Sequence, residues 1–277
     1  SMTVALDGGP NQWDVSSFDF LHPQMRIDPF PTFEVMREQS PVHWDGRAHW
    51  VFKYEDARSV LLGEEFGRSA STFQEQYFES LGAGQPYEYV IKRMTYLDSG
   101  DHHRVRGLFA KTFTPKRIEA LRPFIAEMVD RLLEKASPGE KFDLLELVAH
   151  PVPSLVICEL LGVPTEDRKL FDGWTQRIAH LVSPAITEEQ YADAADALAD
   201  EWRLMEELIT SRSNNLGDDL LSELILASRG DDAITHQELV SNCIFLFSAG
   251  HQTTRDTVGN GVLAMMREPS EWEALAA

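Results

Sequence analysis

The chain has 277 residues, of which 43% are hydrophobic and 25% are charged, as is typical of a soluble globular protein with a sizeable core. Its formal net charge is −20. A negative surface field of this size repels nucleic-acid phosphates and anionic lipid headgroups, so the composition argues against a partner of either kind.

The only two cysteines, Cys158 and Cys243, lie far apart within apolar stretches. This placement indicates neither a disulfide framework nor a cysteine-based zinc site, and it favours a reducing, cytoplasmic location. No apolar run approaches the roughly 18 residues that span a bilayer, and the N-terminus has no signal-peptide pattern. We therefore predict a cytoplasmic protein that does not associate with membranes.

The first third of the chain shows weak periodicity. Residues 1–25 are predicted to form an irregular N-terminal arm, followed by a helix between Pro31 and Ser40. Residues 41–54 hold two short apolar runs around Asp45-Gly46, which predicts a small β-hairpin. Residues 66–96 lack a sustained period and are predicted to form a long loop, a feature that is commonly functional.

Residues 101–277 are predicted to be almost wholly helical, within a single mainly α domain over 1–277. One helix is expected from Pro115 to about Lys135, because apolar residues recur there at helical spacing. Thr235 and Glu238 form a capping box that opens a helix over about 236–267. This central helix would be about 48 Å long, and its apolar first half predicts that it is buried.

The segment LFSAGHQTTRDTVGNG, residues 246–261, places polar residues within this buried helix. Gly250 costs about 1 kcal/mol relative to alanine in a helix, so Ala249-Gly250 predicts either close helix packing or a notch that lets another group approach the backbone. Thr253 can bond to the Ala249 carbonyl or hold a distorted turn open. His251 and Gln252 have an ordinary explanation as solvated or hydrogen-bonded core residues.

A second group of candidate residues lies in 96–123. His102 and Arg106 are four residues apart, so on a helix they share a face and could bind one anion, although a mixed-charge surface helix is the simpler explanation. The segment also concentrates positive charge in an acidic chain, which predicts a docking face or an anionic ligand. The six cations are Arg104, Arg106, Lys111, Lys116, Arg117 and Arg122.

Three motifs together resemble one family. FLFSAGHQTTRDTV resembles the long central helix of cytochromes P450 with its AGxxTT motif, and DSGDHHRVRGLFAKTFTPKRI is similar to the family helix that carries an HxxxR pair and runs into an FTP turn. SLVICELLGVP is a third match. Their order agrees with soluble, bacterial-type members. The resemblance implies a mainly α cytochrome P450 fold, of which this chain is the N-terminal two-thirds, truncated before the ExxR and haem-cysteine regions.

The resemblance assigns cofactor contacts. It implies that the cofactor is haem b, that His102 and Arg106 bind the haem propionates, and that Ala249 and Gly250 line the groove over the haem where dioxygen sits. A small-residue notch of this kind admits a diatomic molecule.

The resemblance also implies catalytic roles. Thr253 would hydrogen-bond the oxygen species and help deliver protons, and Thr254 would support the same turn. Gln252 stands where many relatives carry Asp or Glu. Because an amide cannot ionise, proton delivery would pass through water, Thr253 or the substrate.

The implied reaction inserts one oxygen atom from O2 into a small organic substrate, as in bacterial secondary metabolism. The substrate would be enclosed by the 66–96 loop, by the segment between Trp174 and Thr187, and by the central-helix residues Phe245, Ala249 and Thr253. A ferredoxin-type electron donor would dock near four of the cations, Arg104, Lys111, Lys116 and Arg117.

The chain contains no cysteine in the position of the family's haem ligand. Cys158 and Cys243 are expected to be core residues, so the chain alone is predicted to be inactive, with an apolar side of the central helix left exposed. An alternative is a haem-free, degenerate P450-like auxiliary protein that binds and stabilises a partner enzyme such as a glycosyltransferase. The missing thiolate favours this alternative, whereas intact His102, Arg106 and Thr253 favour a haem enzyme.

Overall fold

The computed structural model describes residues 15–46, 48–67, 85–137, 139–182, 186–229 and 234–276. They fall into two compact units: unit 1 ends at Gly67, and unit 2 comprises the described residues from Gln85 onward. The predicted single-domain organisation stays a prediction.

Unit 1 combines short helices with a hairpin. It contains η1 (Val15–Ser17), α1 (Pro23–Ile27), α2 (Phe30–Gln39), β1 (Val42–Trp44), β2 (His49–Val51) and α3 (Tyr54–Leu62). The strands are antiparallel, with His43 opposite Trp50, and Gly46 adopts a φ of 94° in the turn. The predicted hairpin and the predicted helix near Pro31–Ser40 are therefore confirmed.

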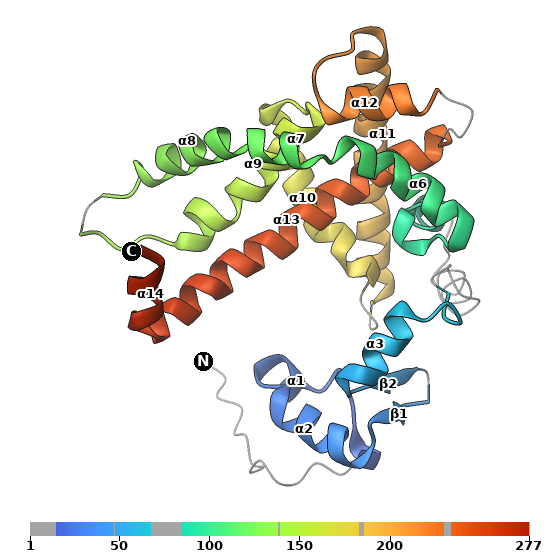
Figure 1. The fold of residues 1–277 in the computed structure, drawn as a ribbon, viewed down its shortest axis with the longest axis vertical. Helices are drawn as coiled ribbons and strands as arrows, with labels where there is room; N and C mark the ends of the chain where they lie inside the picture. The colour runs from blue at the N-terminus through green and yellow to red at the C-terminus, as the bar shows by residue number, and fades with distance from the viewer. Residues whose placement is uncertain are drawn as a thin grey trace. The chain divides into compact units, whose positions relative to one another are not determined.

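The regular secondary structure among the described residues of unit 2 is all helical (Figure 1). Its elements are α5 (Gln85–Val90), η2 (Met94–Tyr96), α6 (Ser99–Thr112), α7 (Pro115–Ala120), α8 (Arg122–Leu133), η3 (Leu145–Ala149), α9 (Pro151–Leu161), η4 (Thr165–Asp167), α10 (Arg168–Ile178), η5 (Ala179–Val182), α11 (Glu188–Asn214), α12 (Leu220–Ala227), α13 (His236–Arg267) and α14 (Pro269–Ala276).

The predicted central helix is α13, which begins at the expected capping box of Thr235 and Glu238. It crosses unit 2 and contacts α9, α10 and α11 (Figure 1). Its first half contributes Val240, Ile244 and Phe247 to the main core. The expectation of a long helix with a buried first half is confirmed.

Two expectations about local structure were wrong. The helix predicted from Pro115 to about Lys135 is divided into α7 and α8, because Pro123 in the first turn of α8 has no N–H to continue the helix from α7. Residues 85–90 and 94–96 form α5 and η2 within the predicted 66–96 loop. Residues 68–84 of that loop and 1–14 of the predicted arm lie outside the described residues, and η1 and α1 occupy part of the remainder of the arm.

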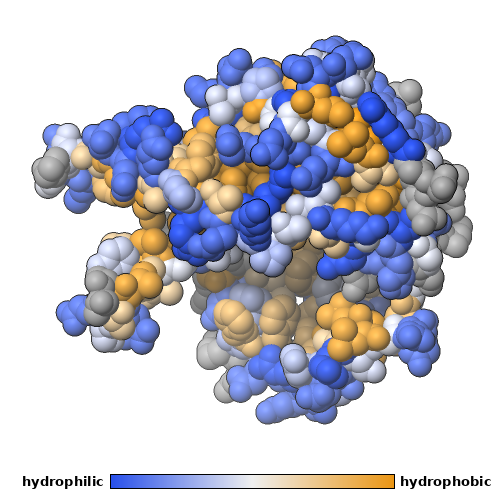
Figure 2. All heavy atoms as spheres, turned by 45° about the horizontal axis from the view of Figure 1, so that its top comes forward, coloured by the Kyte–Doolittle hydropathy of each residue, from blue (hydrophilic) through white to orange (hydrophobic). Residues whose placement is uncertain are grey.

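Apolar side chains are exposed at the C-terminal end of unit 2, and Figure 2 shows orange, apolar patches among hydrophilic ones on one face of the molecule. The exposed residues at this end include Leu263, Met266, Trp272 and Leu275. A groove of about 650 Å³ runs between the last turns of α13 and the segment at Phe142–Leu145. This agrees with the expected apolar exposure on the central helix.

Among the described helices, none is long and apolar enough to cross a membrane.

Candidate functional site

The notch predicted at Ala249-Gly250 lies where α13 crosses α9. A Cβ atom added to Gly250 would lie 2.6 Å from Cδ1 of Ile157 on α9, closer than a normal van der Waals contact. Gly250 therefore lies in close packing between α9 and α13, as one of the two sequence-based explanations expects, and its role over a haem stays a prediction. Ala249 remains half-exposed on the helix.

Thr253 bonds back to its own helix. Its hydroxyl donates to the Ala249 carbonyl at 2.7 Å, and Thr257, one turn later, makes the same bond to the Thr253 carbonyl at 2.7 Å. The backbone is helical through these residues, so the first of the two sequence-based alternatives holds and no open turn is present. Thr253 and Thr254 are exposed, and Gln252 is half-buried.

His102 and Arg106 lie on α6 as predicted. The Nδ1 atom of His102 donates to the Met94 carbonyl at 2.8 Å, so Nε2 can donate a hydrogen bond only when the ring is protonated. Arg106 is exposed, and it has no ion pair or hydrogen bond among the residues that the structure describes. Both groups thus retain unused capacity to bind an anion.

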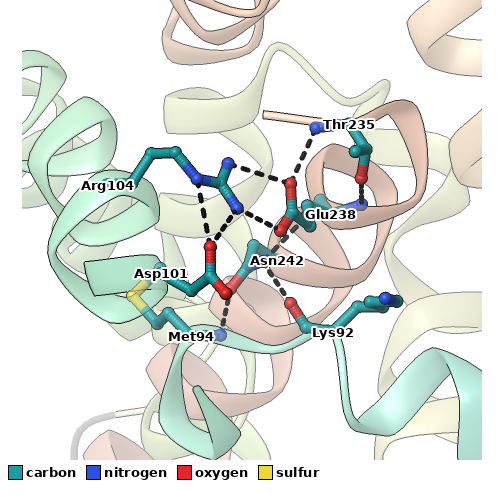
Figure 3. A network of polar contacts seen from close by, with 7 residues as sticks. All are labelled: Lys92, Met94, Asp101, Arg104, Thr235, Glu238 and Asn242. Carbon is teal, nitrogen blue, oxygen red and sulfur yellow. Dashed lines mark hydrogen bonds and ion pairs between the residues drawn. The ribbon is translucent and has the colours of Figure 1, made fainter. Parts of the chain in front are cut away.

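A polar network anchors α6 to the start of α13 (Figure 3). The Arg104 guanidinium donates to both carboxylate oxygens of Glu238, at 2.7 and 3.1 Å, and also contacts Asp101. Nearby, the Asn242 side chain accepts a hydrogen bond from the Met94 amide at 2.7 Å and donates to the Lys92 carbonyl at 2.9 Å. Asn242 therefore holds the amide of Met94, the residue whose carbonyl accepts the hydrogen bond from His102.

Two of the four cations of the predicted docking face, Arg104 and Arg117, are paired within the chain. The side chains of Arg104 and Arg117 are only 27% and 21% exposed. Arg104 is paired with Glu238, and Arg117 is paired with Glu223. Intramolecular pairing is the physical reason, because acidic residues outnumber basic ones by 45 to 25 in the chain. Lys111 and Lys116 remain exposed.

Phe245, predicted to face the substrate, is half-buried on α13 against the main core. The guanidinium carbon of Arg93 lies 6.0 Å from its ring centroid, within the range of a cation–π contact. Its role toward a substrate stays a prediction.

The two cysteines are buried and free. Burial raises the pKa of the Cys158 and Cys243 thiols to about 12, so both are neutral thiols at physiological pH. Their expected role as core residues is confirmed.

Sequence reasoning missed the surroundings of His251. This residue is 1% exposed, and it lies beside Asp172 of α10 and His150, which directly precedes α9. Nothing in the sequence connects these three residues, because they lie on helices far apart in the chain and only the packing of α9, α10 and α13 brings them together.

The chain is similar to known proteins in both sequence and fold. The family model described as Cytochrome P450 matches residues 47–276. Cytochrome P450 monooxygenase PikC of Streptomyces venezuelae is 34% identical over 90% of this chain and 59% of its own length. Erythromycin C-12 hydroxylase of Saccharopolyspora erythraea is 31% identical, over 87% and 58% respectively. This chain thus spans about three fifths of these curated relatives.

A solved structure with a similar fold agrees with this family match. The crystal structure of CalO2 superposes with a TM-score of 0.85 at 27% sequence identity, covering 94% of this chain and 65% of that chain. The mainly helical fold with its small two-stranded sheet is that of these relatives, as the sequence motifs implied. From the family match and the shared fold we conclude that this chain belongs to the cytochrome P450 family.

Proposed function

We propose that this chain forms the oxygen-facing part of a haem-thiolate monooxygenase that inserts one oxygen atom from O2 into a small organic substrate in bacterial secondary metabolism. The observation that carries the proposal is the exposed Thr253 hydroxyl on α13, bonded to Ala249 within the AGxxTT motif. PikC and erythromycin C-12 hydroxylase, by their names a monooxygenase and a hydroxylase, support the reaction class.

The residues present fit a haem group. A haem carries two propionate carboxylates, and the exposed Arg106 and the oriented ring of His102 on α6 offer a cation and a protonatable donor on one helix. When bound, haem b supplies the electron transfer and dioxygen activation that amino-acid side chains cannot. The thiolate ligand is not provided by Cys158 or Cys243, which are buried as neutral thiols.

Thr253 acts by holding and releasing a proton. While its hydroxyl donates to the Ala249 carbonyl, its oxygen can still accept a hydrogen bond from a water on the exposed side. Turning the hydroxyl outward breaks one neutral hydrogen bond, at a net cost of about 1 kcal/mol. Gln252 beside it cannot ionise, so we assign proton delivery to water relayed by Thr253, with Thr254 in support.

Thr253→Ala in the protein at its natural length is expected to lower the product formed per electron consumed by about 10-fold or more, because proton delivery loses its relay. Thr253→Ser, which keeps the hydroxyl, should retain most of the coupling. Product and NAD(P)H consumption, measured together with a ferredoxin-type donor, give the ratio.

Thr257→Ala is the matched control, because it removes the same type of backbone hydrogen bond one turn along α13. Equal uncoupling in the Thr253→Ala and Thr257→Ala variants would show a general effect on the helix and reject the proton-relay role.

We also propose a cytoplasmic location and a ferredoxin-type electron donor. The exposed Lys111 and Lys116 are the cations of the predicted docking face that remain available to an acidic partner. The substrate is assigned to the side of α13 that carries Phe245, Ala249 and Thr253, together with the 66–96 segment.

A further inference from the structure

Three ionisable side chains meet in the interior of unit 2, next to the α9–α13 crossing. His150 directly precedes α9, Asp172 lies on α10 and His251 lies on α13. The His251 and Asp172 side chains are only 1% and 8% exposed, whereas that of His150 is 21% exposed and offers a path from solvent.

The distances between these groups suit a shared ion. Nε2 of His251 lies 3.6 Å from Oδ1 of Asp172, and Nδ1 of His150 lies 3.8 Å from Oδ2 of the same carboxylate. One potential ligand atom from each residue lies within 4.8 Å of the other two. Atoms bound to a tetrahedral Zn²⁺ at about 2.0–2.2 Å lie roughly 3.4 Å apart, so small side-chain adjustments would bring all three into its coordination shell.

Buried polar atoms in this cluster lack hydrogen-bond partners. In the described part of the chain, Nε2 of His251 and Oδ1 of Asp172 face each other without a hydrogen-bond partner, while the His251 ring also interacts with the backbone of His150. Leaving such a group unsatisfied costs about 1–3 kcal/mol. The two facing atoms therefore point to a ligand between them.

Neighbouring groups orient the three side chains as outer-shell residues do in metal sites. Arg168 donates to Oδ2 of Asp172 at 2.7 Å, which leaves Oδ1 for an ion. The amide nitrogen of Gln176 lies 3.3 Å from Nε2 of His150, a contact that helps to hold the imidazole ring in place.

We propose that His150, Asp172 and His251 form a Zn²⁺ site with two imidazoles, one carboxylate and a fourth position open to water. A mixed nitrogen and oxygen donor set with one open position suits Zn²⁺. The ion would link α9, α10 and α13 and raise the stability of their packing. This inference does not depend on the proposed oxygenase activity, because none of the three residues has a role in it.

The test uses the full chain, stripped with a chelator and dialysed against Zn²⁺ alone, with zinc measured by elemental analysis. We expect about one Zn²⁺ per chain and a rise in the thermal midpoint that depends on the zinc concentration. Asp172→Asn, which keeps the side-chain shape, and His150→Gln should each weaken zinc affinity by at least about 10-fold.

His180→Gln is the matched control, because it removes an exposed histidine of η5 outside the cluster. It should bind zinc as the unmodified chain does. If a cluster variant fails to fold, as judged by circular dichroism, the zinc stoichiometry and thermal shift of the unmodified chain decide the matter. Binding of much less than one Zn²⁺ per unmodified chain, or unchanged zinc affinity in folded cluster variants, would overturn the proposal. His150, Asp172 and His251 would then interact only with one another, through shared protons.

Discussion

Replacing Glu201 with glutamine is expected to stabilise the protein by about 4 kcal/mol at pH 8 and by only about 1 kcal/mol at pH 5. Glu201 lies on α11 with 0% of its surface exposed. Within the described chain neither carboxylate oxygen has a hydrogen-bond partner. Burial raises the pKa of Glu201 to about 8, although the positive charge of Arg93 acts against this increase.

The direction of this pH dependence follows from the proton that the folded protein holds on Glu201. Between the usual carboxyl pKa of 4.5 and the raised value of about 8, the folded protein holds a proton that the unfolded chain has released. The free energy of unfolding should therefore fall as pH rises through this window, by up to about 1.4 kcal/mol per pH unit. Glutamine has the same shape and no charge to bury, so the variant lacks this contribution.

Urea unfolding at several pH values measures the effect. Glu207→Gln, which changes an exposed residue of the same helix, is the control and should follow the unmodified protein at every pH. If the unmodified protein and the Glu201→Gln variant gave parallel curves from pH 5 to pH 8, the buried carboxyl would not be protonated in the folded state.

Arg104→Ala and Arg106→Ala are expected to have very different effects on stability, although the two residues lie only two positions apart on α6. Removing Arg104 leaves the Glu238 carboxylate, only 7% exposed, without its bidentate partner, and should cost about 3 kcal/mol of stability. Removing Arg106, which is exposed and unpaired among the described residues, should change stability by less than about 0.5 kcal/mol.

The pH dependence of the Arg104 effect follows from Glu238. Burial alone would raise the pKa of Glu238, but hydrogen bonds from Arg104 and Thr235 outweigh it and hold the pKa below its usual value of 4.5. The stability that the Arg104–Glu238 pair contributes is present above that value and is lost as pH falls through the lowered pKa. The difference between Arg104→Ala and the unmodified protein should therefore shrink in acid.

Haem binding, unlike stability, is expected to depend on Arg106 and on His102. In the protein at its natural length, Arg106→Ala should weaken haem binding, as should His102→Ala, because each removes a proposed propionate contact. Haem content per protein after gel filtration measures this. Full occupancy in both variants would contradict the propionate assignment, and a large loss of stability in Arg106→Ala would contradict its description as an unpaired surface residue.

The sequence predicted the local features whose signals are local. The capping box at Thr235 and the apolar first half of the helix predicted α13, and the Asp45-Gly46 turn predicted the hairpin. The division of α7 from α8 at Pro123 was also a local signal, but the continuous apolar period obscured it. Gly250 had two explanations, and only the fold shows its close packing against Ile157 on α9.

Features that depend on long-range pairing were not predictable from the sequence. The cluster of cations on α6 and α7 predicted a docking face, yet Arg104 and Arg117 find acidic partners more than a hundred residues later in the chain. The triad around His251 combines three helices in the same way. Motif spacing identifies residues that act together within one helix. Partners that lie on other helices can be identified only from the three-dimensional fold.

The central claim is that this chain belongs to a haem-thiolate oxygenase, and the absorption spectrum of the protein at its natural length, reduced and exposed to carbon monoxide, tests it most directly. The account predicts bound haem with the Soret band of a thiolate-ligated carbon monoxide complex. A folded, natural-length protein that binds no haem would contradict it and favour the haem-free auxiliary protein.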